Sequence, residues 1–141
     1  MKRILFATSE AVPFIKTGGL ADVAGSLPKC FDKRYFDIRV ILPKYACMKQ
    51  EWKDKMEYVT HFYMDLGYKN CYVGVLQMEY DGIQFYFIDN EYYFSGPKPY
   101  DSAPWDLEKF AYFSKAALTM LCVIDFRPDI IHCHDWQTGL V

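Results

Sequence analysis

Two polar segments near opposite ends of the 141-residue chain carry the residue types that could do chemistry. The first is Lys16-Thr17-Gly18-Gly19, which follows an apolar run and precedes an expected helix. Paired glycines allow conformations with positive φ and a close backbone approach to a ligand. A helix start offers free N–H groups and a positive dipole to a phosphate, and Lys16 adds a mobile cation. The segment suits anion binding, and the alternative is a plain glycine turn with a solvated lysine.

The glycine pattern differs from two common phosphate-binding loops. No Gly-Lys-Ser/Thr follows, as it would in a Walker A loop, and the glycines lack the third partner of the G-x-G-x-x-G fingerprint. Asp22 lies in the first turn of the expected helix. A carboxylate is favourable there for a simple reason, because it faces the positive end of the helix dipole.

The second segment is His132-Cys133-His134-Asp135-Trp136. Residues two apart in a strand point to the same face, so the two imidazoles could converge. Three interpretations stay open: a metal site, a histidine that hydrogen-bonds a ligand hydroxyl, and a structural His132 packed in the sheet. A metal would need further ligands from His61, the five cysteines or loop carboxylates, because the run H-x-H-x-D-H of metallo-hydrolases is not met. We expect no metal.

The elements that position the first segment follow from apolar patterning. Residues 2–7 and 37–42 predict buried strands. Between them a helix is expected from residue 20 to about Pro28, with its apolar face formed by Leu20, Val23, Ala24 and Leu27. Strand, helix, strand implies a right-handed crossover and a parallel sheet. Ligands bind beyond the carboxyl ends of such strands, where both polar segments lie.

The middle of the chain predicts an antiparallel excursion from this sheet. Residues 56–66, 71–80 and 83–89 are rich in Tyr, Val and Phe, which favours strands. The last two runs are joined by Asp81-Gly82, a pair suited to a type I′ hairpin turn.

The last third of the chain alternates a loop, a helix and a strand. Residues 90–105 contain three prolines and five aromatic rings, and a loop of that length is typical of a functional segment. A helix is expected from residue 106 to about 127, with one side formed by Leu107, Phe110, Ala111, Ser114, Ala117, Leu118 and Leu121. Residues 129–134 predict another strand, and a new helix should open after Asp135. A chain that stops there is expected to be an incomplete α/β domain.

Composition excludes several classes of protein. Hydrophobic residues make up 52% of the chain and charged ones 24%, so a core is available. The net charge of −2 gives no basic face for nucleic acid or anionic membrane. Apolar runs fall short of the ~20 residues of a membrane span, and the N-terminal run is too short for a signal peptide. Five scattered cysteines suggest no disulfide framework. We expect a cytoplasmic protein.

These segments together resemble a known family. Residues Lys16–Val23, K-T-G-G-L-A-D-V, and His132–Leu140, H-C-H-D-W-Q-T-G-L, are similar to the two N-terminal signatures of bacterial glycogen synthases and plant starch synthases. Ser9–Pro13, Val40–Pro43 and Asn90–Phe94 match in place as well. The resemblance covers the whole chain.

The resemblance implies a GT-B fold, which has two Rossmann-like domains and an active site between them. It implies transfer of glucose from ADP-glucose to the non-reducing 4-OH of an α-1,4-glucan, with retention and without a metal or other cofactor. Residues 1–141 would be the incomplete N-terminal, acceptor-side domain, and the C-terminal nucleotide-binding domain is absent. We therefore expect the fragment alone to be inactive.

The matched motifs also imply site residues. Lys16-Thr17-Gly18-Gly19 would bind ADP-glucose, and Asp22 would order that loop and contact sugar hydroxyls. His134 would hydrogen-bond the transferred glucose, with Asp135 fixing its orientation. Tyr100 is carried over as a substrate-binding residue.

Two departures from the family pattern fall near Tyr100. They are the stretch Ser95–Pro99 and Lys109, where an arginine is common. Other readings of the whole chain are a non-catalytic glucan-binding fragment, a nucleotide-dependent oxidoreductase and a metallo-hydrolase. The oxidoreductase is weakened because Leu42-Pro43-Lys44 places no acidic residue at the end of the second expected strand.

Overall fold

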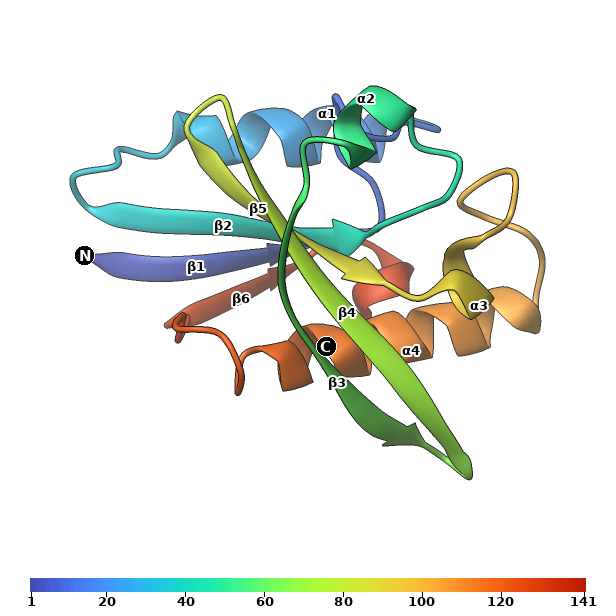
Figure 1. Cartoon of the computed structure of the whole chain (residues 1–141). Coiled ribbons are helices and arrows are strands. Elements are labelled where there is room, and N and C mark those ends of the chain that lie inside the picture. Colours follow the sequence, from blue (N-terminus) through green and yellow to red (C-terminus); the bar gives the residue numbers. More distant parts are fainter.

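Six strands form one sheet in the order β3-β4-β5-β2-β1-β6, and helices lie on both of its faces (Figure 1). The computed structural model describes residues 1–141. The strands are β1 (Lys2–Ala7), β2 (Phe36–Pro43), β3 (Glu57–Leu66), β4 (Lys69–Tyr80), β5 (Ile83–Asp89) and β6 (Ile130–Cys133). The helices are α1 (Gly19–Ser26), α2 (Gln50–Lys53), α3 (Glu91–Phe94) and α4 (Trp105–Met120), and the 3-10 turns are η1 (Leu27–Cys30) and η2 (Trp136–Thr138). None of these helices has the length and apolar character needed to cross a bilayer.

The parallel part of the sheet is as predicted. β1 lies between β2 and β6, and all three run in the same direction, with Phe6 opposite Val40 on one side and His132 on the other. β2 also pairs in parallel with β5. The apolar runs of β1 and β2 are buried because helices cover both faces of the sheet.

The antiparallel excursion is confirmed and lies at one edge of the sheet. β4 pairs antiparallel with both β3 and β5. The turn between β4 and β5 has positive φ at both central residues, 51° at Asp81 and 75° at Gly82, as a type I′ turn requires. The fold class predicted from the sequence, a Rossmann-like parallel sheet with a hairpin excursion, is therefore correct.

Aromatic packing joins the helices to the sheet. Phe14 lies between the sheet and α2, with ring centroids 4.8 Å from Phe85, 5.1 Å from Phe87 and 5.3 Å from Trp52. α1 and α2 cover this face, and α4 runs along the opposite face (Figure 1). There Tyr112 is fully buried and donates its hydroxyl to the Tyr72 carbonyl at 2.7 Å.

The apolar face predicted for α1 is partly wrong. Val23 is 50% exposed, whereas Ala21, Ala24 and Gly25 are buried. α1 packs against the backbone that precedes it: a Cβ at Gly25 would lie 2.4 Å from Val12 Cγ2 and 2.7 Å from the Val12 carbonyl oxygen. Only small residues permit so close an approach. The buried side of α1 therefore consists of alanine and glycine, which a pattern of large apolar residues does not reveal.

The extent and the buried side of α4 also differ from the prediction. The helix begins one residue early, at Trp105, and ends at Met120 instead of near residue 127. Leu107 is 59% exposed and Leu118 37% exposed. The buried stripe includes Lys109, Phe113, Ala116 and Met120. It was not predicted because a lysine in a helix is expected on the exposed side.

The expected loop over residues 90–105 is shorter than predicted. Asn90 caps α3, with its side-chain oxygen accepting from the Tyr93 N–H at 3.0 Å. Tyr93 and Phe94 are buried, so the irregular segment spans only 95–104. After Asp135 the chain forms the 3-10 turn η2 in place of the expected helix.

Candidate functional site

Three segments meet where β1 ends. The residues after this strand, Thr8-Ser9-Glu10, are polar and are at most 2% exposed. The Thr8 N–H donates to the Ile41 carbonyl at 3.0 Å, and the Tyr45 hydroxyl donates to the Ser9 carbonyl at 2.7 Å. These bonds anchor the end of β1 to the end of β2 and to the segment after it. The buried segment then serves as a support for the residues predicted from sequence.

Glu10 holds the glycine loop in place. Its carboxylate oxygen Oε2 accepts from the Thr17 N–H at 3.0 Å and from the Thr17 hydroxyl at 2.5 Å. A Cβ added at Gly18 or Gly19 would meet no atom within 4 Å. Neither glycine has a positive φ, so the left-handed backbone that paired glycines allow is not adopted here. The glycines instead leave the backbone at the start of α1 clear of side chains.

Lys16 and Asp22 form an ion pair across this loop. The Lys16 ammonium lies 2.8 Å from Asp22 Oδ2 and 3.0 Å from Oδ1, and both side chains are about half exposed. An exposed ion pair contributes little to stability. Its geometric effect is to hold the ammonium beside the first turn of α1.

Tyr100 reaches the same support from the 95–104 segment. Its hydroxyl oxygen lies 2.7 Å from Ser9 Oγ. Burial raises the pKa of Tyr100 to about 12, so the phenol stays protonated at neutral pH. It can therefore both donate and accept a hydrogen bond.

Lys109 anchors the segment that carries Tyr100. The ammonium is buried and lies 2.8 Å from the Pro99 carbonyl oxygen, 2.9 Å from Asp101 Oδ2 and 3.3 Å from Asp106 Oδ1. Two carboxylates and a carbonyl compensate the buried charge. The departure from the family pattern at this position thus has a structural role.

His134 comes to the end of β1 from the other side. Its backbone N–H donates to the Ala7 carbonyl at 3.1 Å. The imidazole lies parallel to that of His132, with centroids 4.5 Å apart and an interplanar angle of 2°, and both rings stack on Phe6. The predicted convergence of the two histidines is confirmed. Nowhere do three His, Cys, Asp or Glu side chains gather in a way that could hold a metal ion.

The His134 ring presents a free polar atom. Its Nε2 is buried and has no hydrogen-bond partner. Burial, and secondly the neighbouring His132, lower the pKa of His134, so the ring is neutral at neutral pH. Buried polar atoms are rarely left unpaired. A ligand hydroxyl is the kind of group that Nε2 could bind.

The Asp135 side chain caps the turn that follows it and does not bond to the His134 ring. Its Oδ1 accepts from the Trp136 N–H at 2.7 Å, and no hydrogen bond joins its carboxylate to the His134 ring. The backbone at Asp135 has φ 64° and ψ −178°, a region occupied almost only by glycine. Such strain is typical of functional sites, where the surroundings hold a residue in an unfavourable conformation.

The structure brings the predicted residues together around one support. The glycine loop bonds to Glu10, Tyr100 to Ser9 and His134 to Ala7, so all three approach the end of β1. The sequence analysis assigned no role to Glu10. A carboxylate three residues after the end of a buried strand was the signal that could have identified it.

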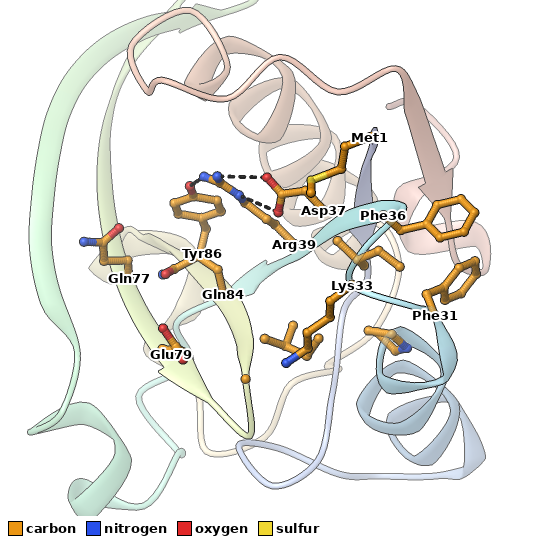
Figure 2. Close-up of a pocket in the computed structure, with 14 residues that line it drawn as sticks. Met1, Phe31, Lys33, Phe36, Asp37, Arg39, Gln77, Glu79, Gln84 and Tyr86 are labelled. Carbon is orange, nitrogen blue, oxygen red and sulfur yellow. Dashed lines mark hydrogen bonds and ion pairs between the residues drawn. The ribbon is translucent and has the colours of Figure 1, made fainter.

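A separate hollow of about 310 Å³ lies at the other end of the parallel strands, near the starts of β1, β2 and β5 (Figure 2). There Arg39 bridges Asp37 and Tyr86, and Lys33 points into the space. None of the predicted site residues lines this hollow.

The fold and the site define a class of protein. A parallel sheet whose carboxyl edge carries a glycine loop, an ammonium group and a neutral imidazole is a Rossmann-like domain suited to an anionic ligand with hydroxyl groups.

Comparison with known proteins specifies the class further. Residues 3–141 match the family described as the starch synthase catalytic domain. The chain is 64% identical to a glycogen synthase of Lachnospira eligens and 66% identical to one of Lachnoclostridium phytofermentans; each alignment covers all of this chain and 30% of the relative. The solved catalytic domain of Starch Synthase IV from Arabidopsis thaliana, bound to ADP and acarbose, superposes with a TM-score of 0.84 at 32% identity. That alignment covers 99% of this chain and 29% of the plant chain.

The chain therefore belongs to the starch synthase catalytic domain family. The resemblance found in the sequence is confirmed, and it is to a family of glycosyltransferases. The chain spans about 30% of the length of the curated relatives that it matches.

Proposed function

We propose that the full-length protein is a glycogen synthase that transfers glucose from ADP-glucose to the non-reducing 4-OH of an α-1,4-glucan, with retention at the anomeric carbon. The observation that carries this proposal is the convergence of the Lys16 loop, Tyr100 and His134 on one buried segment in a member of this family. The plant relative bound to ADP and acarbose supports a nucleotide-sugar donor and a glucan acceptor.

In this proposal the glycine loop binds the diphosphate of the donor. Departure of ADP places negative charge on its phosphate, and fixed donors near that charge lower the barrier. The Lys16 ammonium and the free N–H groups at the start of α1 supply such donors. Asp22 holds Lys16 in place and accepts from hydroxyls of the sugar.

His134 binds the glucose that is transferred. Its neutral ring offers the unpaired Nε2 to a sugar hydroxyl, and Tyr100 lies at the other side of the same support. Asp135 contributes by holding the turn that follows His134, through its bond to the Trp136 N–H. No cofactor or metal takes part in this scheme.

We also propose that residues 1–141 are part of the N-terminal, acceptor-side domain, and that a C-terminal nucleotide-binding domain completes the cleft. β6 is an edge strand of the sheet. Ile130 on this strand is 48% exposed, and Trp136 and Leu140 beyond it are 51% and 72% exposed. Apolar surface at a sheet edge is suited to burial by further chain. The cytoplasmic location expected from the sequence stays a prediction.

The test uses full-length protein with radiolabelled ADP-glucose and glycogen, and UDP-glucose as a parallel donor. Lys16→Ala is expected to raise the KM for ADP-glucose about tenfold or more, because a charge-assisted hydrogen bond is lost. Lys29→Ala is the matched control, since Lys29 pairs with Asp81 at the distant hairpin turn. Absence of transfer by the wild-type protein, or equal KM values for the two variants, would overturn the proposal. Binding of glycogen without release of ADP would favour a non-catalytic glucan-binding protein.

A further inference from the structure

A buried ammonium group joins helix α4 to the segment before it. Lys109 is 1% exposed, and its Nζ lies 2.8 Å from the Pro99 carbonyl oxygen and 2.9 Å from Asp101 Oδ2. These two partners directly precede and follow Tyr100 in the sequence. One side chain of α4 therefore fixes the chain on both sides of a candidate substrate-binding residue.

Asp106, in the first turn of α4, strengthens the same attachment. Its buried carboxylate lies 3.3 Å from the Lys109 ammonium, and both of its oxygens accept from the Asp101 N–H at 3.0 Å. We call Lys109, Asp101, Asp106 and the Pro99 carbonyl the lysine cluster. A buried charge is costly unless it is paired and hydrogen-bonded, so these groups hold one another in a single arrangement.

The segment before α4 depends on the lysine cluster for its position. Every hydrogen bond made by residues 95–101 goes to Lys109, to Asp106 or to Ser9. The segment belongs to no strand or helix, so no ladder of backbone bonds supports it. A stretch of chain with so few bonds opens easily when they are removed.

Tyr100 extends from the lysine cluster to the end of β1. Its ring lies 5.8 Å from that of Phe110 between centroids, and its hydroxyl oxygen lies 2.7 Å from Ser9 Oγ. Ser9 is buried and directly precedes Glu10, which holds the glycine loop through Thr17. The Tyr100 side chain is therefore fixed at both ends, by the lysine cluster at its backbone and by Ser9 at its hydroxyl.

Stability alone does not account for a charged cluster at this position. A buried ion pair is often no more stabilising than apolar side chains of similar volume. α4 already packs on the sheet through Phe113, Ala116 and Met120, which are fully buried. The lysine cluster adds a geometric restraint, because its hydrogen bonds have good distances and angles in only one position of the segment.

We propose that Lys109 is a positioning residue for glucose transfer, which acts through the lysine cluster to hold the Tyr100 hydroxyl at the carboxyl edge of the sheet. This inference rests on the proposed function. Lys109 itself is buried away from the substrate. The donor is bound by the Lys16 loop, which Glu10 holds from a different segment. The lysine cluster should therefore set the rate of transfer and have little effect on the affinity for ADP-glucose.

The experiment uses the full-length protein and measures kcat for transfer from ADP-glucose to glycogen and, by calorimetry without glycogen, the Kd for ADP-glucose. Lys109→Met keeps most of the side-chain length and removes the charge. It is expected to lower kcat about 10- to 100-fold, because a misplaced group of this kind can cost roughly 100-fold in rate. The Kd for ADP-glucose should change by less than about twofold. Lys109→Arg keeps the charge and N–H donors for the same oxygens, so most of the rate should return.

A double-mutant cycle separates positioning from general destabilisation. Tyr100→Phe removes the hydroxyl that the lysine cluster holds in place. Lys109→Met should therefore lower kcat much less in the Tyr100→Phe background than in the wild-type protein. Asp101→Asn is a milder variant for the case in which Lys109→Met does not fold, because the Asp101 side chain is partly exposed. It weakens one bond to the ammonium and should lower kcat about fivefold.

Lys69→Ala is the matched control. Lys69 pairs at 2.9 Å with Glu108, which directly precedes Lys109 but lies outside the lysine cluster, so kcat should stay at the wild-type value. An unchanged kcat in folded Lys109→Met or in Asp101→Asn, equal losses of kcat and of ADP-glucose affinity, or additive effects in the cycle would overturn the positioning role. Failure of the proposed function appears differently, as absence of glucose transfer by the wild-type protein.

Discussion

At the scale of single residues, Glu10 is the group that joins the predicted site to the fold. It is 2% exposed, and one of its oxygens accepts both bonds from Thr17. The adjacent Ser9 contacts Tyr100. A buried carboxylate held by a loop is costly unless its bonds are made, so the loop and the carboxylate stabilise each other.

Replacing Glu10 tests this arrangement. Glu10→Ala is expected to raise the KM for ADP-glucose in the full-length protein and to lower stability by about 1–3 kcal/mol, because the loop loses its acceptor. Glu10→Gln keeps an acceptor oxygen and should recover part of both effects. Thr17→Val removes only the bond from the Thr17 hydroxyl to Glu10. Its effect on the free energy of unfolding and on the KM should therefore be smaller in the Glu10→Ala background than in the wild-type protein. Additive effects in steady-state kinetics and thermal unfolding would contradict the pairing.

His134 gives a prediction about pH. In a histidine NMR titration its pKa should lie below 6.5, since burial is the main cause of its shift. His132→Ala should raise that pKa because it removes the weaker cause, but burial should keep it below the ordinary value. A His134 pKa above 6.5 in the wild-type protein would contradict the assignment.

The same shift has a consequence for stability. The unfolded chain takes up a proton at His134 more readily than the folded one. The contribution of the neutral ring to the free energy of unfolding is therefore fully present above about pH 6.5. It is lost as the pH falls through the lower pKa of the folded state. His134→Gln should therefore reduce the fall in unfolding temperature over that range.

At the scale of elements, the position of α1 depends on its contact with the segment around Val12. The Val12 N–H donates to the Ala21 carbonyl at 3.1 Å, and Gly25 lies against the Val12 backbone. These contacts fix the start of α1 directly after the glycine loop. Two opposite effects decide what a methyl group at Gly25 would do.

Gly25→Ala is expected to destabilise the protein. Alanine in a helix interior gains roughly 0.5–1 kcal/mol over glycine. Its Cβ would, however, lie 2.7 Å from a carbonyl oxygen that cannot rotate away, and overpacking costs about 1–3 kcal/mol. The unfolding temperature should fall and the KM for ADP-glucose should rise. Ser26→Ala, at the exposed next position, is the control, and an equal or higher unfolding temperature for Gly25→Ala would contradict the close contact.

At the scale of the whole molecule, the proposed function makes the 141 residues one side of a cleft between two domains. The loop, Tyr100 and His134 all lie at the carboxyl edge of one sheet, and the groups expected to clamp the nucleotide belong to the proposed second domain. Catalysis by positioned groups requires that both sides be present, because a misplacement of about 1 Å can cost roughly 100-fold in rate.

The isolated chain is therefore expected to show no glucose transfer from ADP-glucose to glycogen, whereas the full-length protein is expected to show it. The assay measures release of ADP and incorporation of label into glycogen, with the full-length protein at equal molar concentration as the control. Turnover by the fragment at the full-length rate would contradict the two-sided site.

Much of the fold and of the site could be predicted from sequence because the signals are local. Alternation and apolar runs marked each strand to within about two residues, and Asp81-Gly82 specified its turn. The glycine loop and the paired histidines were recognisable because residue type and spacing in a short segment carry their chemistry.

What only the tertiary structure decided depends on contacts between distant segments. Gly25 is buried against Val12, and Lys109 is buried among oxygens of the loop before α4, so hydrophobicity misplaced the inner faces of both helices. Glu10 became part of the site only when Thr17 folded onto it. Local sequence records the preference of each residue, whereas burial of a glycine or a charge depends on the partner that folding brings to it.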